Sequence, residues 1–167
     1  MNKNNMYWQE LIAEIEKELI NITMLQKELN NEMKKKKYNR RATGSILHDF
    51  YNCCERIFRK ISSEINGGFG QNENWHKDLM YRMTIEFKGV RPYVISEDLA
   101  AELDDYLSFR HIFRNIYGFE LRGERLDRLI KKFDRVSNKF KEVINNDQER
   151  IYETSGKRKK RCSEGVY

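Results

Sequence analysis

Apolar residues recur every seven positions along the N-terminal part of the chain, which is typical of a long helix with one packed seam. Two neighbouring series form this seam: Trp8, Ile15, Ile22 and Leu29 in the first, and Ile12, Leu19, Gln26 and Met33 in the second. The pattern predicts one helix over residues 6–37, in which Gln26 is a polar break. Such a seam needs a partner helix, which this chain or another chain could supply.

The rest of the chain shows apolar positions at three- and four-residue steps, without the sustained alternation that strands show. This spacing predicts four further helices, over residues 45–65, 74–88, 97–117 and 122–150. Ser45 and Ser96 stand where N-capping residues are expected, and two acidic residues follow Ser96. About five helices with short connections predict an all-α fold, an antiparallel helical bundle with a long N-terminal helix.

The positive charge of the chain is concentrated in its flanks. The net charge is +6, but residues 1–41 carry nine Lys/Arg against six Glu, and residues 157–167 carry five Lys/Arg against one Glu. We therefore divide the chain into three parts: an N-terminal amphipathic helix with a basic connector (1–41), a helical bundle (42–153) and a basic, disordered tail (154–167). The basic runs in the flanks could bind phosphate or could serve as solvated segments.

Composition excludes several classes of protein. With one Pro and nine Gly in 167 residues, the chain is neither collagen-like nor of low complexity. It has no apolar run of membrane-spanning length and no signal-peptide pattern, so we expect a cytoplasmic protein without a membrane partner. Three cysteines in such a chain predict free thiols. His48, His76, His111 and the cysteines lack the spacing of a zinc site, so we expect no metal and no cofactor.

The most unusual stretch has the sequence FRHIFRNIYGFEL and lies at the end of a predicted helix. Helical geometry places Arg110, Arg114 and Tyr117 on one face, with His111 and Asn115 on the neighbouring stripe. Guanidinium groups hold phosphate and stabilise a pentavalent transition state, and an imidazole exchanges protons near neutral pH. These side chains are the parts of a metal-independent ribonuclease. They are also the parts of an Arg/His/Asn network that ties helices together.

This stretch resembles the signature of the HepT-like proteins of the HEPN superfamily, whose motif is Arg, a polar residue, three further residues, His, any residue and Tyr. The segment ILHDFYNCCERIFRKI is similar to the first core helix of the family, and WHKDLMYRM with RPYVIS is similar to its middle region. The resemblance covers residues 45–150 and leaves the N-terminal helix as an extension. It implies a small α-helical domain, and many such domains are endoribonuclease toxins encoded beside a minimal nucleotidyltransferase antitoxin of the MntA kind.

The resemblance implies roles for individual residues. Arg110 matches the motif arginine of the RNA-cleaving site, His111 matches the polar position after it, and Tyr117 matches the tyrosine that the nucleotidyltransferase modifies with AMP. The motif histidine would fall where this chain has Asn115. Asparagine does not titrate, so it cannot act as a general base. Either His111 transfers the proton instead, or this copy is a weak or inactive nuclease.

Three hypotheses follow. In the first, a HepT-like toxin cleaves RNA without metal, its catalytic residues being Arg110, His111 and Asn115, while Arg110 and Arg114 bind phosphate. AMP transfer to Tyr117 by the MntA-like nucleotidyltransferase would silence this endoribonuclease. In the second, the chain is a catalytically silent HEPN subunit that binds the nucleotidyltransferase and presents a substrate to it. In the third, it is a structural coiled-coil protein. Because the family usually dimerises, we also expect a homodimer.

Overall fold

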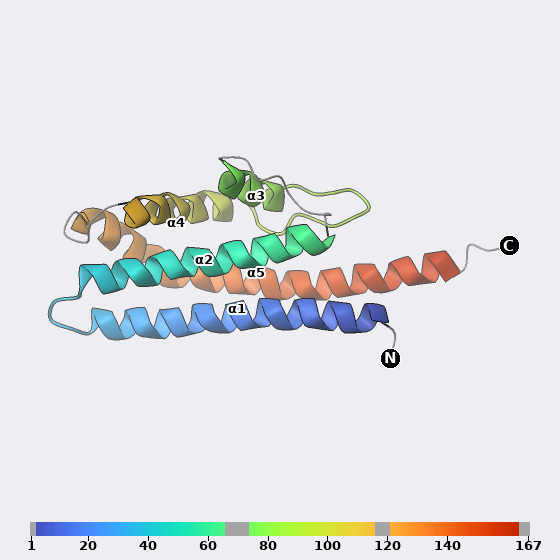
Figure 1. Cartoon of the computed structure of the whole chain (residues 1–167), viewed down its shortest axis with the longest axis horizontal. Coiled ribbons are helices and arrows are strands. Elements are labelled where there is room, and N and C mark those ends of the chain that lie inside the picture. The colour runs from blue at the N-terminus through green and yellow to red at the C-terminus, as the bar shows by residue number, and fades with distance from the viewer. Residues whose placement is uncertain (1–2, 66–73, 116–120, 164–167) are drawn as a thin grey trace.

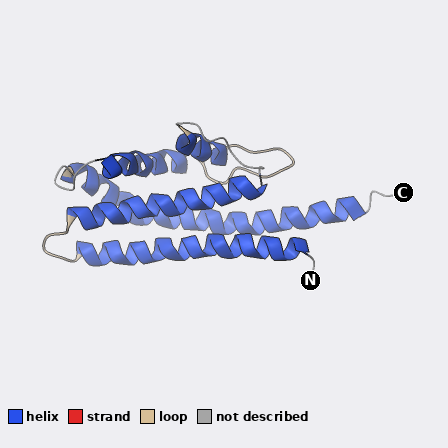
Figure 2. Ribbon diagram, in the orientation of Figure 1, coloured by secondary structure: helices blue, strands red, loops and turns tan. Residues whose placement is uncertain are grey.

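The computed structural model describes residues 3–65, 74–115 and 121–163, which are helical apart from short connections (Figure 2). These residues form α1 (Lys3–Met33), α2 (Arg40–Ile65), α3 (Trp75–Thr84), α4 (Glu97–Asn115) and α5 (Gly123–Ser163). The one β-type pairing that they contain is an isolated bridge between Phe87 and Arg91. None of these helices combines the length and the hydrophobicity that crossing a bilayer requires. The prediction of an all-α bundle of about five helices is confirmed.

Helices α1, α2 and α5 run along the long axis of the molecule, and the shorter α3 and α4 lie on the far side of α2 from α1 (Figure 1). The seam of α1 is buried inside the chain, because α1 packs against both α2 and α5. The buried seam residues are Ile15, Leu19, Ile22, Gln26 and Leu29. Gln26, the polar break, donates its amide N–H to Asn138 of α5 at 3.0 Å. The chain therefore supplies the partner helices that the seam requires.

The connector between α1 and α2 comprises residues 34–39, earlier in the chain than predicted. The basic run of four lysines, residues 34–37, therefore lies entirely in the connector. The side-chain oxygen of Asn39 accepts hydrogen bonds from the backbone N–H groups of Arg41 (2.9 Å) and Ala42 (3.1 Å). Asparagine is among the residues that favour this capping position. The prediction of Ser45 as the cap is wrong, because α2 begins before it.

The segment between α3 and α4 is held by a buried arginine. Helix α3 ends at Thr84, before the predicted end near residue 88. Arg91 is buried, and its guanidinium donates to the carbonyl oxygens of Arg82, Ile85 and Pro92 at 2.8 to 3.1 Å. One side chain thus donates to main-chain carbonyls at the end of α3 and in the segment that follows it, which fixes the non-helical path of this segment.

Helix α5 continues to Ser163, beyond the predicted end near residue 150. Residues 154–163 therefore belong to the last helix, because Lys and Arg favour helices and no proline interrupts this stretch. The apolar stripe predicted for this helix is present. Its buried residues are Leu126, Leu129, Phe133, Val136, Phe140 and Ile144.

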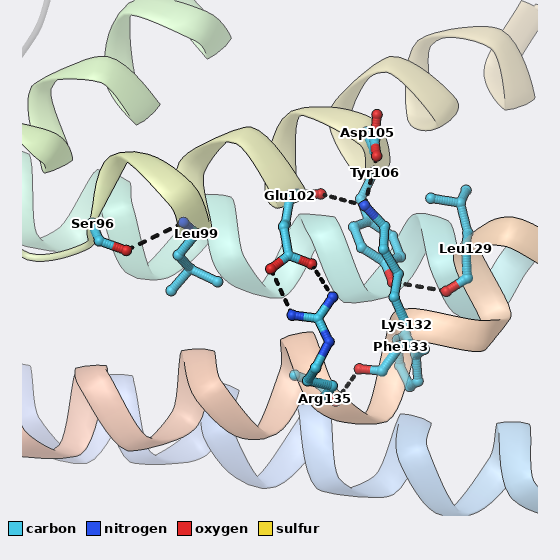
Figure 3. Close-up of polar contacts among 10 residues, drawn as sticks. Ser96, Leu99, Glu102, Asp105, Tyr106, Leu129, Lys132, Phe133 and Arg135 are labelled. Atoms are coloured by element: carbon cyan, nitrogen blue, oxygen red, sulfur yellow. Dashed lines mark hydrogen bonds and ion pairs between the residues drawn. The ribbon is translucent and has the colours of Figure 1, made fainter.

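Polar side chains cap α4 and fix it on α5 (Figure 3). The hydroxyl of Ser96 accepts a hydrogen bond from a backbone N–H in the first turn at 3.2 Å, so this predicted N-cap is confirmed. The Glu102 carboxylate binds the Arg135 guanidinium through two hydrogen bonds of 2.6 and 2.7 Å. The buried Tyr106 hydroxyl donates to the carbonyl oxygen of Leu129 at 2.9 Å. These contacts set the orientation of the helix that carries the RHIFRN stretch.

Helices α2 and α4 approach each other closely at Gly44. A Cβ atom at this position would lie 2.6 Å from a ring carbon of Phe113. Only glycine, which has no Cβ, lets the ring sit against the α2 backbone. The contact places the C-terminal end of α4 against the first turns of α2.

Cys53 and Cys54 are buried free thiols on α2, as the cysteine content predicted. Burial raises the pKa of the Cys53 thiol to about 12. A thiol that stays protonated at neutral pH is a poor nucleophile, so these cysteines contribute to packing and not to chemistry.

Candidate functional site

Arg110 lies in the last two turns of α4 and is buried between α4 and α2. Its Nη1 donates a hydrogen bond to Glu55 Oε2 of α2 at 2.8 Å, and this contact is also an ion pair. The guanidinium carbon lies 5.8 Å from the ring centre of Tyr51, one turn before Glu55 on α2. The motif arginine is therefore held in place by α2 and is not a mobile surface cation.

His76, in the first turn of α3, joins the same carboxylate. Its Nδ1 lies 2.5 Å from Glu55 Oε2 and 3.3 Å from Arg110 Nη1, so a single carboxylate oxygen serves both side chains. The ring of Trp75 lies against the His76 ring, with 3.6 Å between the ring centres. A carboxylate at Nδ1 fixes the orientation of an imidazole and leaves Nε2 for another partner, as in many catalytic and metal-binding histidines.

His111 follows Arg110 on α4 and is exposed to solvent. Its ring centre lies 5.4 Å from that of His76, in an edge-to-face arrangement. Partial burial lowers the pKa of His111, and the neighbouring His76 and Arg110 lower it further. A neutral imidazole at neutral pH can accept a proton, so His111 has the charge state that a general base requires.

Arg114 and Asn115 stand in the last turn of α4, and both are exposed. The side-chain amide of Asn115 donates to the carbonyl oxygen of His111 at 2.7 Å, so its N–H is used within its own helix. The structure therefore places Arg110 and His111 in the cluster around Glu55 and leaves Arg114 and Asn115 on the surface beside it. Tyr117 lies outside the described residues.

Glu55 and His76 are site residues that the sequence did not single out. Glu55 stands on the apolar face of α2, one turn after Tyr51 and one turn before the buried Phe58. A charged residue on an apolar face was the available signal, because a carboxylate is almost never buried without a partner. His76 offered no such signal, because it is 34 residues from Arg110 and meets it only through helix packing.

His48, the remaining histidine, stays outside this cluster. Its Nδ1 lies 3.0 Å from Asp49 Oδ1 and 3.2 Å from the amide nitrogen of Asn52. Its ring lies 5.5 Å from the Phe113 ring, at the contact between α2 and α4. Within the described ranges, no group of three or more His, Cys, Asp or Glu side chains is arranged to hold a metal ion.

The chemistry of the cluster follows from its four charged or titratable groups. A guanidinium with spare N–H donors can hold a phosphate, an exposed neutral imidazole can accept a proton, and a second imidazole lies beside it. Arg110 Nε is buried and has no hydrogen-bond partner among the described residues. A buried donor without a partner is costly to the folded protein.

Comparison with known protein families gives a match over more than half of the chain. The family is described as HepT-like protein, and its sequence model matches residues 42–151. The matched region runs from the first turn of α2 into the second half of α5 and contains all four residues of the cluster, while α1 lies outside it. No curated protein and no solved structure matches the chain.

Proposed function

The chain belongs to the HepT-like proteins of the HEPN superfamily, and from this premise we propose that it is a toxin that cleaves RNA internally without a metal ion. The observation that carries the proposal is the cluster of Arg110, His111, His76 and Glu55, which three helices bring together. It contains a cation for phosphate and two imidazoles for proton transfer, which transphosphorylation of RNA requires.

In this reaction the ribose 2′-oxygen attacks the adjacent phosphorus, and the bond from phosphorus to the 5′-oxygen breaks. His111 takes the proton of the 2′-hydroxyl, and its lowered pKa keeps the ring neutral and able to do so. His76, oriented through Nδ1 by Glu55, supplies a proton from Nε2 to the leaving 5′-oxygen. The products are a 2′,3′-cyclic phosphate and a 5′-hydroxyl, so no water and no metal take part in the bond changes.

Arg110 stabilises the negative charge of the pentavalent phosphorane. Glu55 engages Nη1 of the guanidinium, so Nη2 is the donor that would meet the phosphate. Because Arg110 is anchored before substrate arrives, little reorganisation is needed at the moment of reaction. Arg114, exposed one turn further along α4, contributes a second contact to the RNA backbone.

Control by a partner enzyme completes the proposal. A minimal nucleotidyltransferase of the MntA kind transfers AMP from ATP to the hydroxyl of Tyr117, and pyrophosphate leaves. Tyr117 follows the last residue of α4 by two positions in the sequence. We place this toxin–antitoxin pair in the cytoplasm, with the toxin as a homodimer whose two motif helices face each other.

A catalytically silent HEPN subunit is the second candidate function, and Asn115 is the observation that favours it. Asn115 cannot titrate, and its amide is engaged by the carbonyl oxygen of His111. A silent subunit would bind the nucleotidyltransferase and present a substrate to it. Replacing Asn115 by His tests for an eroded nuclease. A large gain of cleavage indicates that the motif histidine was lost from an active enzyme, whereas no change indicates either that His111 transfers the proton or that the subunit is silent.

The experiment that tests the proposed reaction compares His111→Gln and His76→Gln with His48→Gln as the matched control. Loss of a general acid or base lowers the rate by roughly 100- to 10,000-fold. We expect that loss for the first two variants and parental cleavage for the third, because His48 lies outside the cluster. Equal cleavage by all three variants would show that the cluster does not carry the reaction.

A further inference from the structure

We propose that one end of the bundle, next to the cleavage site, binds the backbone of the RNA strand that leaves that site. We call this surface the basic end. Its residues are Lys34, Lys36, Lys37, Arg41, Arg114 and Arg122, all of them exposed. The inference rests on the proposed function, because it takes RNA as the substrate, and it names a binding surface that the catalytic cluster does not include.

The connector that carries the lysines is fixed to the bundle and is not a free loop. Glu32 accepts hydrogen bonds from the backbone N–H of Asn39 (2.7 Å) and from the side chain of Lys35 (2.5 Å). The hydroxyl of Tyr38 donates to Asp127 of α5 at 2.6 Å. Glu32 and Asp127 thus hold the connector to the bundle, which fixes the position of the neighbouring lysines.

The connector and the end of the motif helix meet at the same end of the molecule (Figure 1). Gly44, in the second turn of α2, touches Phe113 of α4, which directly precedes Arg114. The guanidinium of Arg40 reaches the carbonyl oxygen of Leu121 just before α5 begins, at 3.5 Å. Cations from the connector, from the end of α4 and from Arg122, just before α5, therefore lie at one end of the bundle.

Part of the positive charge on the sides of the bundle is neutralised across helices, in the pairs Arg56–Glu18, Lys60–Glu14, Lys132–Asp105 and Arg135–Glu102. Within the described residues, none of the six cations of the basic end has an ion-pair partner. Positive charge that a protein leaves uncompensated on one surface creates a potential that attracts polyanions.

The distance between the catalytic cluster and the basic end is one that a continuous RNA strand can span. Arg41 and Glu55 are 14 positions apart on the same helix, which at 1.5 Å per residue is about 21 Å. Single-strand sites of other proteins span roughly 4 to 16 nucleotides along positively charged grooves. A strand whose scissile phosphate lies at Arg110 would therefore continue past Arg114 onto the connector lysines within a few nucleotides.

The test measures binding without cleavage, with a fluorescent RNA oligonucleotide of 2′-O-methyl nucleotides that cannot be transphosphorylated. Anisotropy titrations over a series of KCl concentrations give the salt dependence of affinity. The variant is Lys34→Gln/Lys36→Gln/Lys37→Gln, and the matched control is Lys17→Gln/Lys60→Gln/Lys88→Gln, which removes the same charge elsewhere. Losing three phosphate contacts on a single strand lowers the slope of log affinity against log salt by about 2. We expect that change for the connector variant and a parental slope for the control.

A parental slope and affinity in the connector variant would overturn the inference. Equal losses of slope in the connector variant and the control would overturn it too, because they would indicate general charge attraction only. Replacing the same three lysines by Arg keeps the charge and should keep the parental slope, while circular dichroism checks that each variant is folded. Failure of the proposed function would look different. The oligonucleotide would bind with the expected slope, but the parent protein would not cleave unmodified RNA.

Discussion

Replacement of Glu55 by Ala should destabilise the protein far more than loss of a surface charge. The Glu55 and Arg110 side chains are 7% and 9% exposed, so the variant leaves a buried guanidinium without its counter-charge. Removing one partner of a buried ion pair costs about 3–5 kcal/mol. With about 2–4 °C per kcal/mol for a chain of this size, the melting temperature should fall by about 6–20 °C.

The coupling between the two residues can be measured with a double-mutant cycle. Arg110→Ala alone leaves Glu55 with His76 as its remaining partner, at 2.5 Å. The double variant removes both charges, so its loss of unfolding free energy should be smaller than the sum of the single losses by about 2–3 kcal/mol. Urea unfolding followed by circular dichroism gives each free energy, and unchanged m values confirm a common transition.

A matched control comes from a surface pair of the same charges. Glu14 and Lys60 are 45% and 44% exposed, so Glu14→Ala should change the free energy of unfolding by less than about 0.5 kcal/mol. If Glu55→Ala costs no more than this control, or if the two single losses add to within about 0.5 kcal/mol, then Arg110 is not held by Glu55 and the anchored cluster is refuted.

Three further predictions concern packing, capping and protonation. Gly44→Ala should cost about 1–3 kcal/mol of stability in urea unfolding, because its Cβ would lie 2.6 Å from the Phe113 ring; an unchanged midpoint would mean that α2 and α4 separate freely. Asn39→Ala should cost about 1 kcal/mol by removing the cap of α2, whereas Asn39→Asp should cost less; equal losses in thermal unfolding would contradict the capping role. The folded protein lowers the pKa of His111 below 6.5, so the base stays neutral and active as the pH falls to that value. The cleavage rate measured against pH should therefore reach half its maximum, on the acidic side, below pH 6.5; a midpoint above 6.5 would exclude His111 as the base.

The fold could be predicted from the sequence to the extent that burial determines it. Apolar spacing identified every helix, because each one buries a continuous face. The partner of the α1 seam could not be predicted, since a helix of the same chain and a helix of another chain bury the same residues. Helix ends were less well predicted than helix positions. The cap of α2, for example, is Asn39, which precedes the first apolar residue of the pattern that identified this helix.

The candidate site was only half visible in the sequence. Arg110 and His111 are neighbours in a recognisable motif, so local spacing was enough to find them. Glu55 is 55 positions from Arg110, and only the packing of α2 against α4 brings the two together. The same packing explains why Arg110 is buried while Arg114, on the same predicted face, is exposed. Helical periodicity indicates which residues share a face, but it does not indicate where a neighbouring helix ends.

The most direct test of the proposed activity is a cleavage assay with mixed cellular RNA in the presence of EDTA. The protein should first be shown by mass spectrometry to carry no AMP on Tyr117, and Arg110→Lys should be assayed beside it. We predict cleavage that resists the chelator, leaves 2′,3′-cyclic phosphate ends and is strongly reduced in the variant, because Lys lacks the forked donors that serve Glu55 and phosphate together. Intact RNA after incubation with the folded, unmodified protein, or cleavage that EDTA abolishes, would contradict a metal-independent endoribonuclease.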